Sequence, residues 1–333
     1  MNAIASDSAR NRESSRPLKT ADFEYEFPSN QPPHAMPAER GNVRLMVLHR
    51  KTGRIEHRRF HDIVDYLHGM EVWVNDSSLL PRWIHVVRLP GHQETVYLIR
   101  ELRERVWEVF GVMTEGVEQC RFFTKNGQAI QVEKTGRPLF WTFAFSGDPN
   151  IAETGSYLSL PGMSLKRDLS ETPLAQALYA CVPGSFAAPT AGIHFTMEIL
   201  ARLDVHHLTL HTVPGTFYEV TSELPEDHRM DPEYYRIPQA PRRPVAAIGT
   251  TSAKALEAWG RKAQFEGWSD LYIRPPFEWT VVDALLTNLH RPRETLLMLT
   301  CAFGGYEAVM EAHREAVREC YQFSFYGDLL LLV

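Results

Sequence analysis

Residues 187–196 read Ala-Ala-Pro-Thr-Ala-Gly-Ile-His-Phe-Thr and bring together several side chains that can do chemistry. Proline and glycine shape the backbone, hydroxyls donate and accept hydrogen bonds, and a histidine titrates near neutral pH. We interpret His194 as a candidate catalytic acid or base, with Thr190 and Gly192 beside it as ligand contacts. Further segments of similar make-up follow at 214–217, 248–252, 281–290 and 326–328. Together they predict an enzyme whose catalytic groups lie on loops between strands and helices.

The segment 245–261 has the pattern of a strand, a short turn and a helix. An apolar stretch, Val245–Ile248, leads into the turn, and a helix is predicted over Ala253–Arg261. Free backbone N–H groups at such a helix start can bind a carboxylate or a phosphate. The turn also offers three hydroxyls; its residues are Gly249, Thr250, Thr251 and Ser252. A simpler alternative is that Ser252 only caps the helix. The chain has neither Gly-x-Gly-x-x-Gly nor a Walker sequence, which argues against a dinucleotide site and an NTPase.

Residues 281–290 read Val-Val-Asp-Ala-Leu-Leu-Thr-Asn-Leu-His. We expect a strand with Asp283 inside it and with Asn288 and His290 at its end. Ligands bind at the carboxyl ends of strands in open α/β sheets. Asn288 is therefore a candidate ligand contact, and His290 and Asp283 are candidate catalytic residues. A structural carboxylate is the alternative for Asp283.

The remaining histidines give weaker signals. His228 and Glu233 lie in a polar stretch that we interpret as part of the site, with a surface loop as the alternative. His206, His207 and His211 are interpreted as structural. No histidine and carboxylate spacing typical of a metal site is present. We therefore predict neither a catalytic metal nor a prosthetic group.

Composition limits the class of protein. The 333 residues are 44% hydrophobic and 23% charged, with a net charge of −6, which is typical of a globular protein and argues against non-specific coating of nucleic acid. The four cysteines are far apart, there is no apolar run of about 18 residues, and the N-terminus lacks the apolar core of a signal peptide. We therefore predict a cytoplasmic protein. We expect it to be a monomer or a weak oligomer. Residues 40–59 are basic, however, and could contact RNA phosphates. The candidates are Arg50, Lys51, Arg58 and Arg59; solvated turn charges are the alternative.

The pattern along the chain predicts an α/β fold with an inserted small all-β domain that resembles a barrel. Residues 1–17 are polar and predict a disordered tail. Residues 18–82 and 161–333 predict the α/β catalytic domain. Between them, residues 83–160 show short alternating apolar stretches separated by turns, typical of a barrel. Helices are also predicted from Thr196 to Leu203 and over Tyr306–Tyr321.

Several of these segments, in this order, resemble the S-adenosylmethionine:tRNA ribosyltransferase-isomerase family of the queuosine pathway. The similarity covers roughly residues 18–333 and is most specific after Ser185. It includes Ala187–Thr196, Gly249–Ser252 and Val281–His290. The resemblance implies that further residues bind substrate, namely Gly215, Thr216, Phe217, Tyr326 and Asp328.

The resemblance also implies the reaction. Members of the family use S-adenosylmethionine (AdoMet) as a co-substrate and transfer its ribosyl carbons to the aminomethyl group of 7-aminomethyl-7-deazaguanine in a tRNA anticodon. A base removes a C5′ proton, the furanose opens, and adenine and methionine leave as epoxyqueuosine forms. Such a reaction needs a base, an acid for adenine and dipoles for a transient alkoxide. His194 and His290 suit the proton transfers, and either can be the C5′ base.

Two motifs differ from the family pattern, which usually has Arg-Asp-x-Ser-Arg-Leu and Asn-Asp-Thr-Arg. This chain has Arg40-Gly-Asn-Val-Arg-Leu and Asn75-Asp-Ser-Ser at those places. A relative that passes the ribosyl unit to a small-molecule amine, or fragments AdoMet in natural-product biosynthesis, is therefore an alternative. A catalytically silent RNA-binding module is a third, which the grouping of His194, Asn288 and His290 disfavours.

Overall fold

A computed structural model describes residues 17–27, 39–111, 113, 117, 120–158, 165–166, 175–217, 219–323 and 326–333. Its largest feature is a nine-stranded sheet in the order β17-β15-β14-β3-β16-β18-β19-β1-β2. The strands are β1 (Arg44–His49), β2 (Arg54–Arg59), β3 (Glu71–Asn75), β14 (Asp204–His211), β15 (Glu233–Arg236), β16 (Val245–Ile248), β17 (Glu266–Ser269), β18 (Ala284–Asn288) and β19 (Leu329–Leu332).

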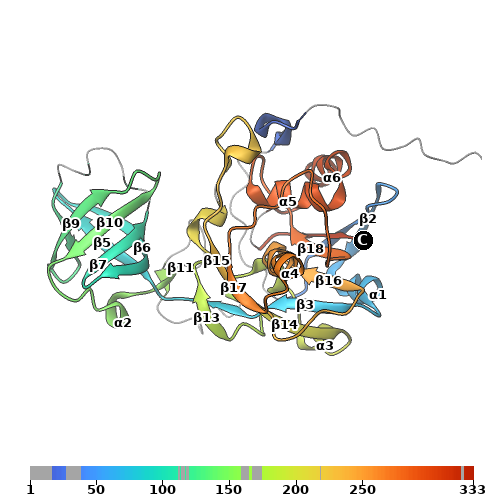
Figure 1. The fold of residues 1–333 in the computed structure, drawn as a ribbon, viewed down its shortest axis with the longest axis horizontal. Helices are drawn as coiled ribbons and strands as arrows, with labels where there is room; N and C mark the ends of the chain where they lie inside the picture. Colours follow the sequence, from blue (N-terminus) through green and yellow to red (C-terminus); the bar gives the residue numbers. More distant parts are fainter. Residues whose placement is uncertain are drawn as a thin grey trace, which may run out of the picture.

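Helices cover both faces of this sheet, as Figure 1 shows. These helices are α1 (Ile63–Leu67), α3 (Met197–Leu200), α4 (Thr250–Lys262), α5 (Thr295–Gly304) and α6 (Tyr306–Arg318). The short α2 (Ile151–Thr154) lies beside the barrel described below. In β1, Met46 and Leu48 pack toward α4, α5 and α6, whereas Leu45 and Val47 pack toward α1 and α3. Alternate residues of a strand point to opposite faces, so a strand buried on both sides reads as a continuous apolar run.

Six antiparallel strands close into a barrel in the order β10-β7-β6-β5-β8-β9. They are β5 (Trp83–Arg88), β6 (His92–Arg103), β7 (Val106–Phe110), β8 (Phe122–Thr124), β9 (Ala129–Lys134) and β10 (Phe140–Phe145). The barrel has its own apolar core, which includes Val86, Leu98 and Phe143. Figure 1 shows it at one end of the molecule, with β1 and β2 at the other. The predicted fold class, an α/β body with an inserted barrel, is confirmed.

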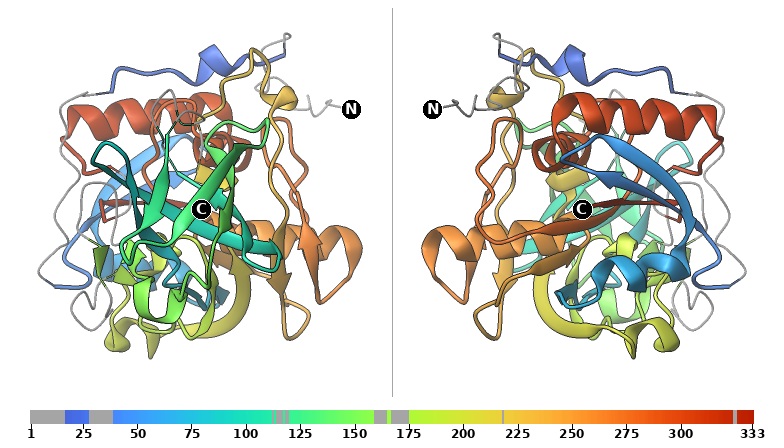
Figure 2. Two further views of the ribbon diagram at one scale, coloured as in Figure 1. Left: turned by 90° about the vertical axis from the view of Figure 1, so that its left-hand side faces the viewer. Right: turned by 90° about the vertical axis from the view of Figure 1, so that its right-hand side faces the viewer.

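Smaller elements join these parts. They are the strands β4 (Ser77–Leu79), β11 (Tyr157–Leu158), β12 (Leu165–Lys166) and β13 (Val182–Ser185), and the 3-10 turns η1 (Thr20–Phe23), η2 (Phe60–Asp62), η6 (Thr190–Gly192), η7 (Pro214–Phe217) and η8 (Pro225–Asp227). Figure 2 shows η1 lying on the helical layer, where the Tyr306 hydroxyl donates to the Asp22 carbonyl at 2.6 Å. Most of the predicted tail, residues 1–16, lies outside the described residues. The predicted domain boundaries stay predictions.

Three predicted helices differ from the observed ones in length. The helix after the Gly-Thr-Thr-Ser turn begins at Thr250 instead of Ala253, so the hydroxyl residues form its first turn. Thr196 caps α3 as predicted, its hydroxyl accepting from the Ile199 N–H, but α3 ends at Leu200. The last helix ends at Arg318, and Cys320 has a positive φ of 53°, which a right-handed helix does not allow.

Strand direction brings the predicted site segments to one edge of the sheet. Strands β14, β3, β16 and β18 are mutually parallel, while β19 is antiparallel to β18 and parallel to β1. The carboxyl ends of the first four therefore share an edge with the amino ends of β1 and β19. We call this the site edge; it is formed by Asn75, His211, Ile248 and Asn288, where strands end, and by Arg44 and Leu329, where strands begin.

Candidate active site

The loop that contains Thr190 is tied to the end of β18. The Thr190 hydroxyl donates to Oδ1 of Asn288 at 2.9 Å. This contact fixes the amide so that Nδ2, the donor nitrogen of Asn288, faces away from Thr190. Nδ2 is buried and has no hydrogen-bond partner among the residues that the structure describes. A buried donor without a partner costs roughly 1–3 kcal/mol, so a ligand acceptor beside it would remove that cost.

The turn before α4 offers a second set of donors. Gly249 has a φ of +89°, which favours glycine, and the α-helix starts directly after it. The hydroxyl of Ser252 donates to the Ile248 carbonyl at 2.7 Å. Ser252 lies inside the first turn of α4 and the N-cap is Gly249, so Ser252 does not cap the helix as the simpler alternative predicted. The Thr251 hydroxyl, in contrast, is buried without a partner in the described part of the chain. Thr251 and the free N–H groups of the first turn are thus the available ligand contacts here.

His194 lies on the α1 side of the sheet, where its ring centroid is 6.0 Å from that of Phe60. It is fully buried, and within the described residues neither ring nitrogen makes a hydrogen bond of standard geometry. Burial and, to a smaller extent, Arg40 lower the pKa of His194 to about 4, although the backbone of Gly327 opposes the shift. His194 is therefore neutral at pH 7 and has two nitrogens available to a ligand or a moving proton.

Gly192 makes room for a tyrosine near His194. A Cβ atom at Gly192 would lie 1.8 Å from the hydroxyl oxygen of Tyr179. Any side chain at this position would displace the buried ring of Tyr179. The glycine is thus explained by packing, and its predicted contact with substrate stays a prediction.

His290 lies on the opposite side of the sheet, against α6. Its Nε2 atom is 2.8 Å from the Thr287 hydroxyl, and its backbone N–H donates to Nε2 of His313 at 3.3 Å. Burial, with a smaller effect from His313, lowers the pKa of His290 to about 3. The ring is thus neutral and already bonded on one side, and its Nδ1 atom lies 3.9 Å from the Glu294 carboxylate. The two predicted catalytic histidines therefore sit on opposite faces of the sheet.

Asp283 does not join them. It precedes β18 instead of lying inside it, so it is at the opposite end of the strand from Asn288. Its carboxylate accepts from the Val245 N–H at 2.9 Å and lies 3.4 Å from Arg243. The prediction that Asp283 belongs to the catalytic group is wrong in its geometry, because the carboxylate ties two strand starts together at the far edge.

Asp328 and Tyr326 lie at the site edge, before β19. The Asp328 carboxylate accepts from the Arg44 backbone N–H at 2.7 Å, from Arg44 Nε at 3.1 Å and from the Gln322 N–H at 2.9 Å. These hydrogen bonds give the carboxylate of Asp328 a structural role, and they fix the position of Arg44. Tyr326 is buried, and burial raises its pKa to about 12. It is a neutral hydroxyl that can only donate or accept a hydrogen bond.

The segment 214–217 forms η7 beside the barrel. A Cβ atom at Gly215 would lie 2.2 Å from the carboxylate of Asp231. Arg137, on the barrel, donates to both oxygens of that carboxylate at 2.6 Å. The glycine therefore makes room for an ion pair that links the barrel to the body. The side chains of Thr216 and Phe217 lie outside the described part, so their predicted roles stay predictions.

His228 and Glu233 have different surroundings. His228 is half-buried, its ring is 5.5 Å from that of Tyr272, and its Nε2 atom has no partner within the described residues. Glu233 is completely buried and forms an ion pair with Lys254 of α4, which is only 4% exposed. Sequence reasoning missed Lys254. The available signal was its position four residues after Thr250, on the same side of the helix.

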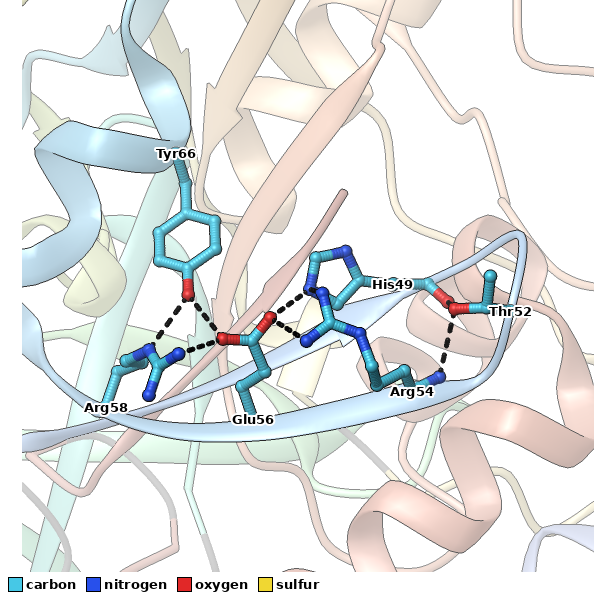
Figure 3. A network of polar contacts seen from close by, with 6 residues as sticks. All are labelled: His49, Thr52, Arg54, Glu56, Arg58 and Tyr66. Atoms are coloured by element: carbon cyan, nitrogen blue, oxygen red, sulfur yellow. Dashed lines mark hydrogen bonds and ion pairs between the residues drawn. The ribbon is translucent and has the colours of Figure 1, made fainter.

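The basic segment divides into internal and exposed side chains. Arg50 donates to the Asp283 carbonyl at 2.7 Å and its guanidinium lies 4.0 Å from the centre of the Phe303 ring. Both terminal nitrogens of the Arg50 guanidinium therefore bond to backbone carbonyls of the protein, and the predicted contact with RNA stays a prediction. Figure 3 shows the carboxylate of Glu56 between Arg54 and Arg58, with His49 and Tyr66 also bonded to it.

This network partly neutralises β2. The hydrogen bond between Glu56 and His49 has the largest effect, and the hydrogen bond with Tyr66 and the charges of the two arginines add to it. Together they lower the pKa of Glu56 to about 2. Glu56 is thus ionised at neutral pH and cancels one positive charge. Lys51, in the turn before β2, and Arg58 and Arg59, on β2, remain exposed. Charged side chains on an edge strand also prevent pairing with another chain.

Among the described residues, one group has the geometry to hold a metal ion. Ligand atoms of Glu71, Asp204 and His206 lie within 4.8 Å of one another. They are near the starts of β3 and β14, at the edge away from the site, and Arg242 already donates to Glu71 at 2.9 Å. The prediction of no catalytic metal stays a prediction. No helix in the described part is long and apolar enough to span a membrane.

The molecule is thus an α/β protein with an inserted barrel and with buried, partly unsatisfied polar groups at the carboxyl ends of parallel strands. The family model described as "Queuosine biosynthesis protein" matches residues 20–332, and the chain belongs to that family.

Named relatives agree with this assignment. A protein of Thermotoga maritima named S-adenosylmethionine:tRNA ribosyltransferase-isomerase is 36% identical over 341 residues, which is 95% of this chain and 100% of the relative. One of the same name from Acetivibrio thermocellus is 34% identical over 349 residues, with the same coverage. The crystal structure of the S-adenosylmethionine tRNA ribosyltransferase from Thermotoga maritima matches with a TM-score of 0.51 and 29% identity over 94% of this chain and 100% of that one.

Proposed function

We propose that this protein is an S-adenosylmethionine:tRNA ribosyltransferase-isomerase, which transfers the ribosyl unit of AdoMet to 7-aminomethyl-7-deazaguanine in tRNA and releases adenine and methionine. Family membership and the full-length match to relatives of that name support it. The predicted alternative, transfer to a small-molecule amine, is not favoured by these matches. The chain is accordingly an enzyme of the transferase and isomerase type.

One observation indicates which residues bind the substrate in this proposal. Polar atoms of Thr251, Asn288 and His194 are buried without partners in the described part of the chain, and all three follow or end elements at the site edge. Buried polar groups in native proteins are nearly always satisfied, so a bound polar molecule is the natural partner. AdoMet offers a carboxylate, ribose hydroxyls and an adenine, each of which can accept a hydrogen bond.

We assign the ligand contacts accordingly. The first turn of α4, with Thr250 and Thr251, suits the methionine carboxylate, because a helix N-terminus favours an anion. Asn288 suits an acceptor on the ribose or adenine. His194 suits a proton transfer, although a pKa of about 4 makes it a weak base, so deprotonation of C5′ must rely on the acidity that the sulfonium gives that carbon. His290, bonded to Thr287, suits support of the strand end better than direct contact.

The acceptor brings a second set of contacts. A tRNA carries its charge on phosphates, and the exposed side chains of Lys51, Arg58 and Arg59 suit such contacts. Arg50 is not one of these exposed side chains. A tRNA-modifying enzyme acts where tRNA is, so a cytoplasmic location follows from the proposal. The proposal requires no prosthetic group, with AdoMet as a consumed co-substrate.

A product assay tests this function. The protein is incubated with AdoMet and with tRNA that carries 7-aminomethyl-7-deazaguanine, and adenine and methionine are quantified. We expect both in equal amounts, and none with tRNA that lacks the modified base. S-adenosylhomocysteine as the main product would refute the proposal. Equal release of adenine and methionine with a small amine, but not with tRNA, would favour the alternative acceptor.

A further inference from the structure

His211 ends β14 at the site edge, and its surroundings differ from those of a structural histidine. Its Nδ1 atom is 2.8 Å from the hydroxyl of Ser77. Tyr234 stacks on the ring with centroids 5.8 Å apart and an interplanar angle of 23°. A Cβ atom at Gly184 would lie 2.3 Å from the ring, so the imidazole is held between a glycine and a tyrosine.

A chain of hydrogen bonds connects the backbone of Thr212 to Nδ1 of His211. The backbone N–H of Thr212 donates to the Ser185 hydroxyl oxygen at 3.0 Å. The Ser185 and Ser77 hydroxyls lie 2.6 Å apart, and either can donate to the other. In the arrangement that we infer, Ser185 donates to Ser77, and Ser77 donates to Nδ1 of His211 at 2.8 Å. Both serines are fully buried, so solvent does not compete for these protons.

The direction of this chain decides what the imidazole can do. A neutral histidine that accepts at Nδ1 carries its proton on Nε2. Nε2 has no hydrogen-bond partner among the described residues, and the ring is half-buried. Burial lowers the pKa of His211, although Asp76 opposes the shift, so the neutral form predominates at pH 7. In the arrangement in which Ser77 donates to Nδ1, His211 presents Nε2–H as a hydrogen-bond donor.

The end of β14 is hydrogen-bonded to the loop that contains Thr190. The N–H of Phe186 donates to the Thr212 carbonyl at 3.0 Å, and the N–H of Ala187 donates to the Thr212 hydroxyl at 3.0 Å. Three residues later, the same loop reaches Asn288 through Thr190. His211 therefore lies at the same edge of the sheet as the unsatisfied polar atoms, on the side of that edge that is nearer to the barrel.

We propose that His211 is a catalytic residue that donates its Nε2–H hydrogen bond to the ribosyl oxygen that gains negative charge when the furanose ring opens. The inference rests on the proposed function, because that reaction forms the alkoxide. A rigid neutral donor stabilises such an oxygen without moving, which is the basis of an oxyanion hole. Ser77 and Ser185 are positioning residues that act through His211.

Kinetics of substituted enzymes test the donor. His211→Ala should lower kcat by about 10²–10³-fold, as expected for a lost oxyanion donor, with KM for AdoMet changed by less than about threefold. His211→Gln, whose amide N–H can replace Nε2–H, should keep activity within about tenfold of the wild type. The matched control is His207→Ala on the exposed part of the same strand, which should leave kcat unchanged. Wild-type kcat in His211→Ala, or equal damage in His211→Gln, would overturn the proposal.

A second measurement does not depend on activity. Nitrogen-15 NMR of the full-length protein labelled in histidine should show His211 as the Nε2–H tautomer at pH 7. Ser77→Ala removes the donor to Nδ1 and should mix the two tautomers while the melting temperature shows that the fold persists. An Nδ1–H tautomer or an imidazolium in the wild type would refute the hydrogen-bond chain. If the wild type forms no adenine from AdoMet and tRNA, the proposed function fails, and the NMR result still decides the state of His211.

Discussion

At the scale of single residues, the candidate site is defined by which polar atoms the protein uses and which it leaves. Ser252, Asp283 and Asp328 were all predicted to contact substrate or take part in catalysis, yet each is bonded within the protein. Their types and spacing resemble those of ligand contacts, because hydroxyls and carboxylates also close helix turns and tie strands. Sequence pattern alone does not separate the two uses. Thr251 and Asn288 differ because the Thr251 hydroxyl and the Asn288 Nδ2 atom are buried without a partner among the residues that the structure describes.

Asn288→Asp tests the free amide. The change keeps an oxygen to accept from Thr190 but removes both Nδ2–H donors. We expect AdoMet to bind at least about tenfold more weakly, since each lost bond to a buried acceptor costs on the order of 1–3 kcal/mol. Thr190→Val, which only loosens the amide, should have a smaller effect. Isothermal titration calorimetry measures both. Unchanged affinity in Asn288→Asp, with an unchanged melting temperature, would remove Asn288 from the site.

At the scale of elements, the sequence predicted the central strands and the strand–turn–helix unit at 245–262 well. Continuous apolar runs, such as Val245–Ile248 and the run that precedes Asn288, have few alternatives in a protein of this size. Ends of elements were predicted less accurately, as at Arg318 and Thr250, because they depend on backbone angles and tertiary contacts. The buried pair of Glu233 and Lys254 joins β15 to α4 and could not be predicted, because it links residues whose proximity only the fold defines.

Lys254→Met should destabilise the protein strongly. It removes the ammonium that faces the fully buried carboxylate of Glu233, and breaking a buried ion pair costs about 3–5 kcal/mol. The double substitution Lys254→Met with Glu233→Leu should recover most of that loss, because it also removes the buried charge. Arg314→Met breaks an exposed pair with Glu311 on α6 and should cost less than about 1 kcal/mol. Urea unfolding measures the three variants. A loss in Lys254→Met no larger than in Arg314→Met would contradict a structural role for the pair.

At the scale of the whole molecule, the barrel meets the body through contacts that join distant parts of the chain. Phe186 packs against Trp83, Tyr97 and Phe110 with centroids 4.8–5.5 Å apart, and Arg137 binds Asp231. The spacing of turns in the sequence predicted a barrel. The face of the barrel that meets the body could not be predicted, because it depends on these contacts between residues far apart in the sequence. Inside the body, three histidines are buried against the sheet, namely His194, His290 and His313.

Those histidines predict how stability depends on pH. Burial lowers their pKa values from 6.5 to about 4, 3 and 4, so below pH 6.5 the unfolded chain binds protons that the folded chain does not. Stability therefore falls as the pH decreases from 6.5 toward 4, by up to about 1.4 kcal/mol per pH unit for each histidine. His313→Gln should make this slope shallower, and the exposed control His61→Gln should not. Equal unfolding free energies at pH 7 and pH 5 would contradict the account.

The most direct test of the central claim follows the carbon atoms of AdoMet. Two samples are prepared, one labelled in the ribosyl carbons and one in the methyl group, and each is incubated with the protein and with tRNA bearing 7-aminomethyl-7-deazaguanine. The account predicts that the ribosyl label enters the tRNA while the methyl label leaves with methionine. Methyl label in the tRNA, with ribosyl label left in S-adenosylhomocysteine, would contradict it.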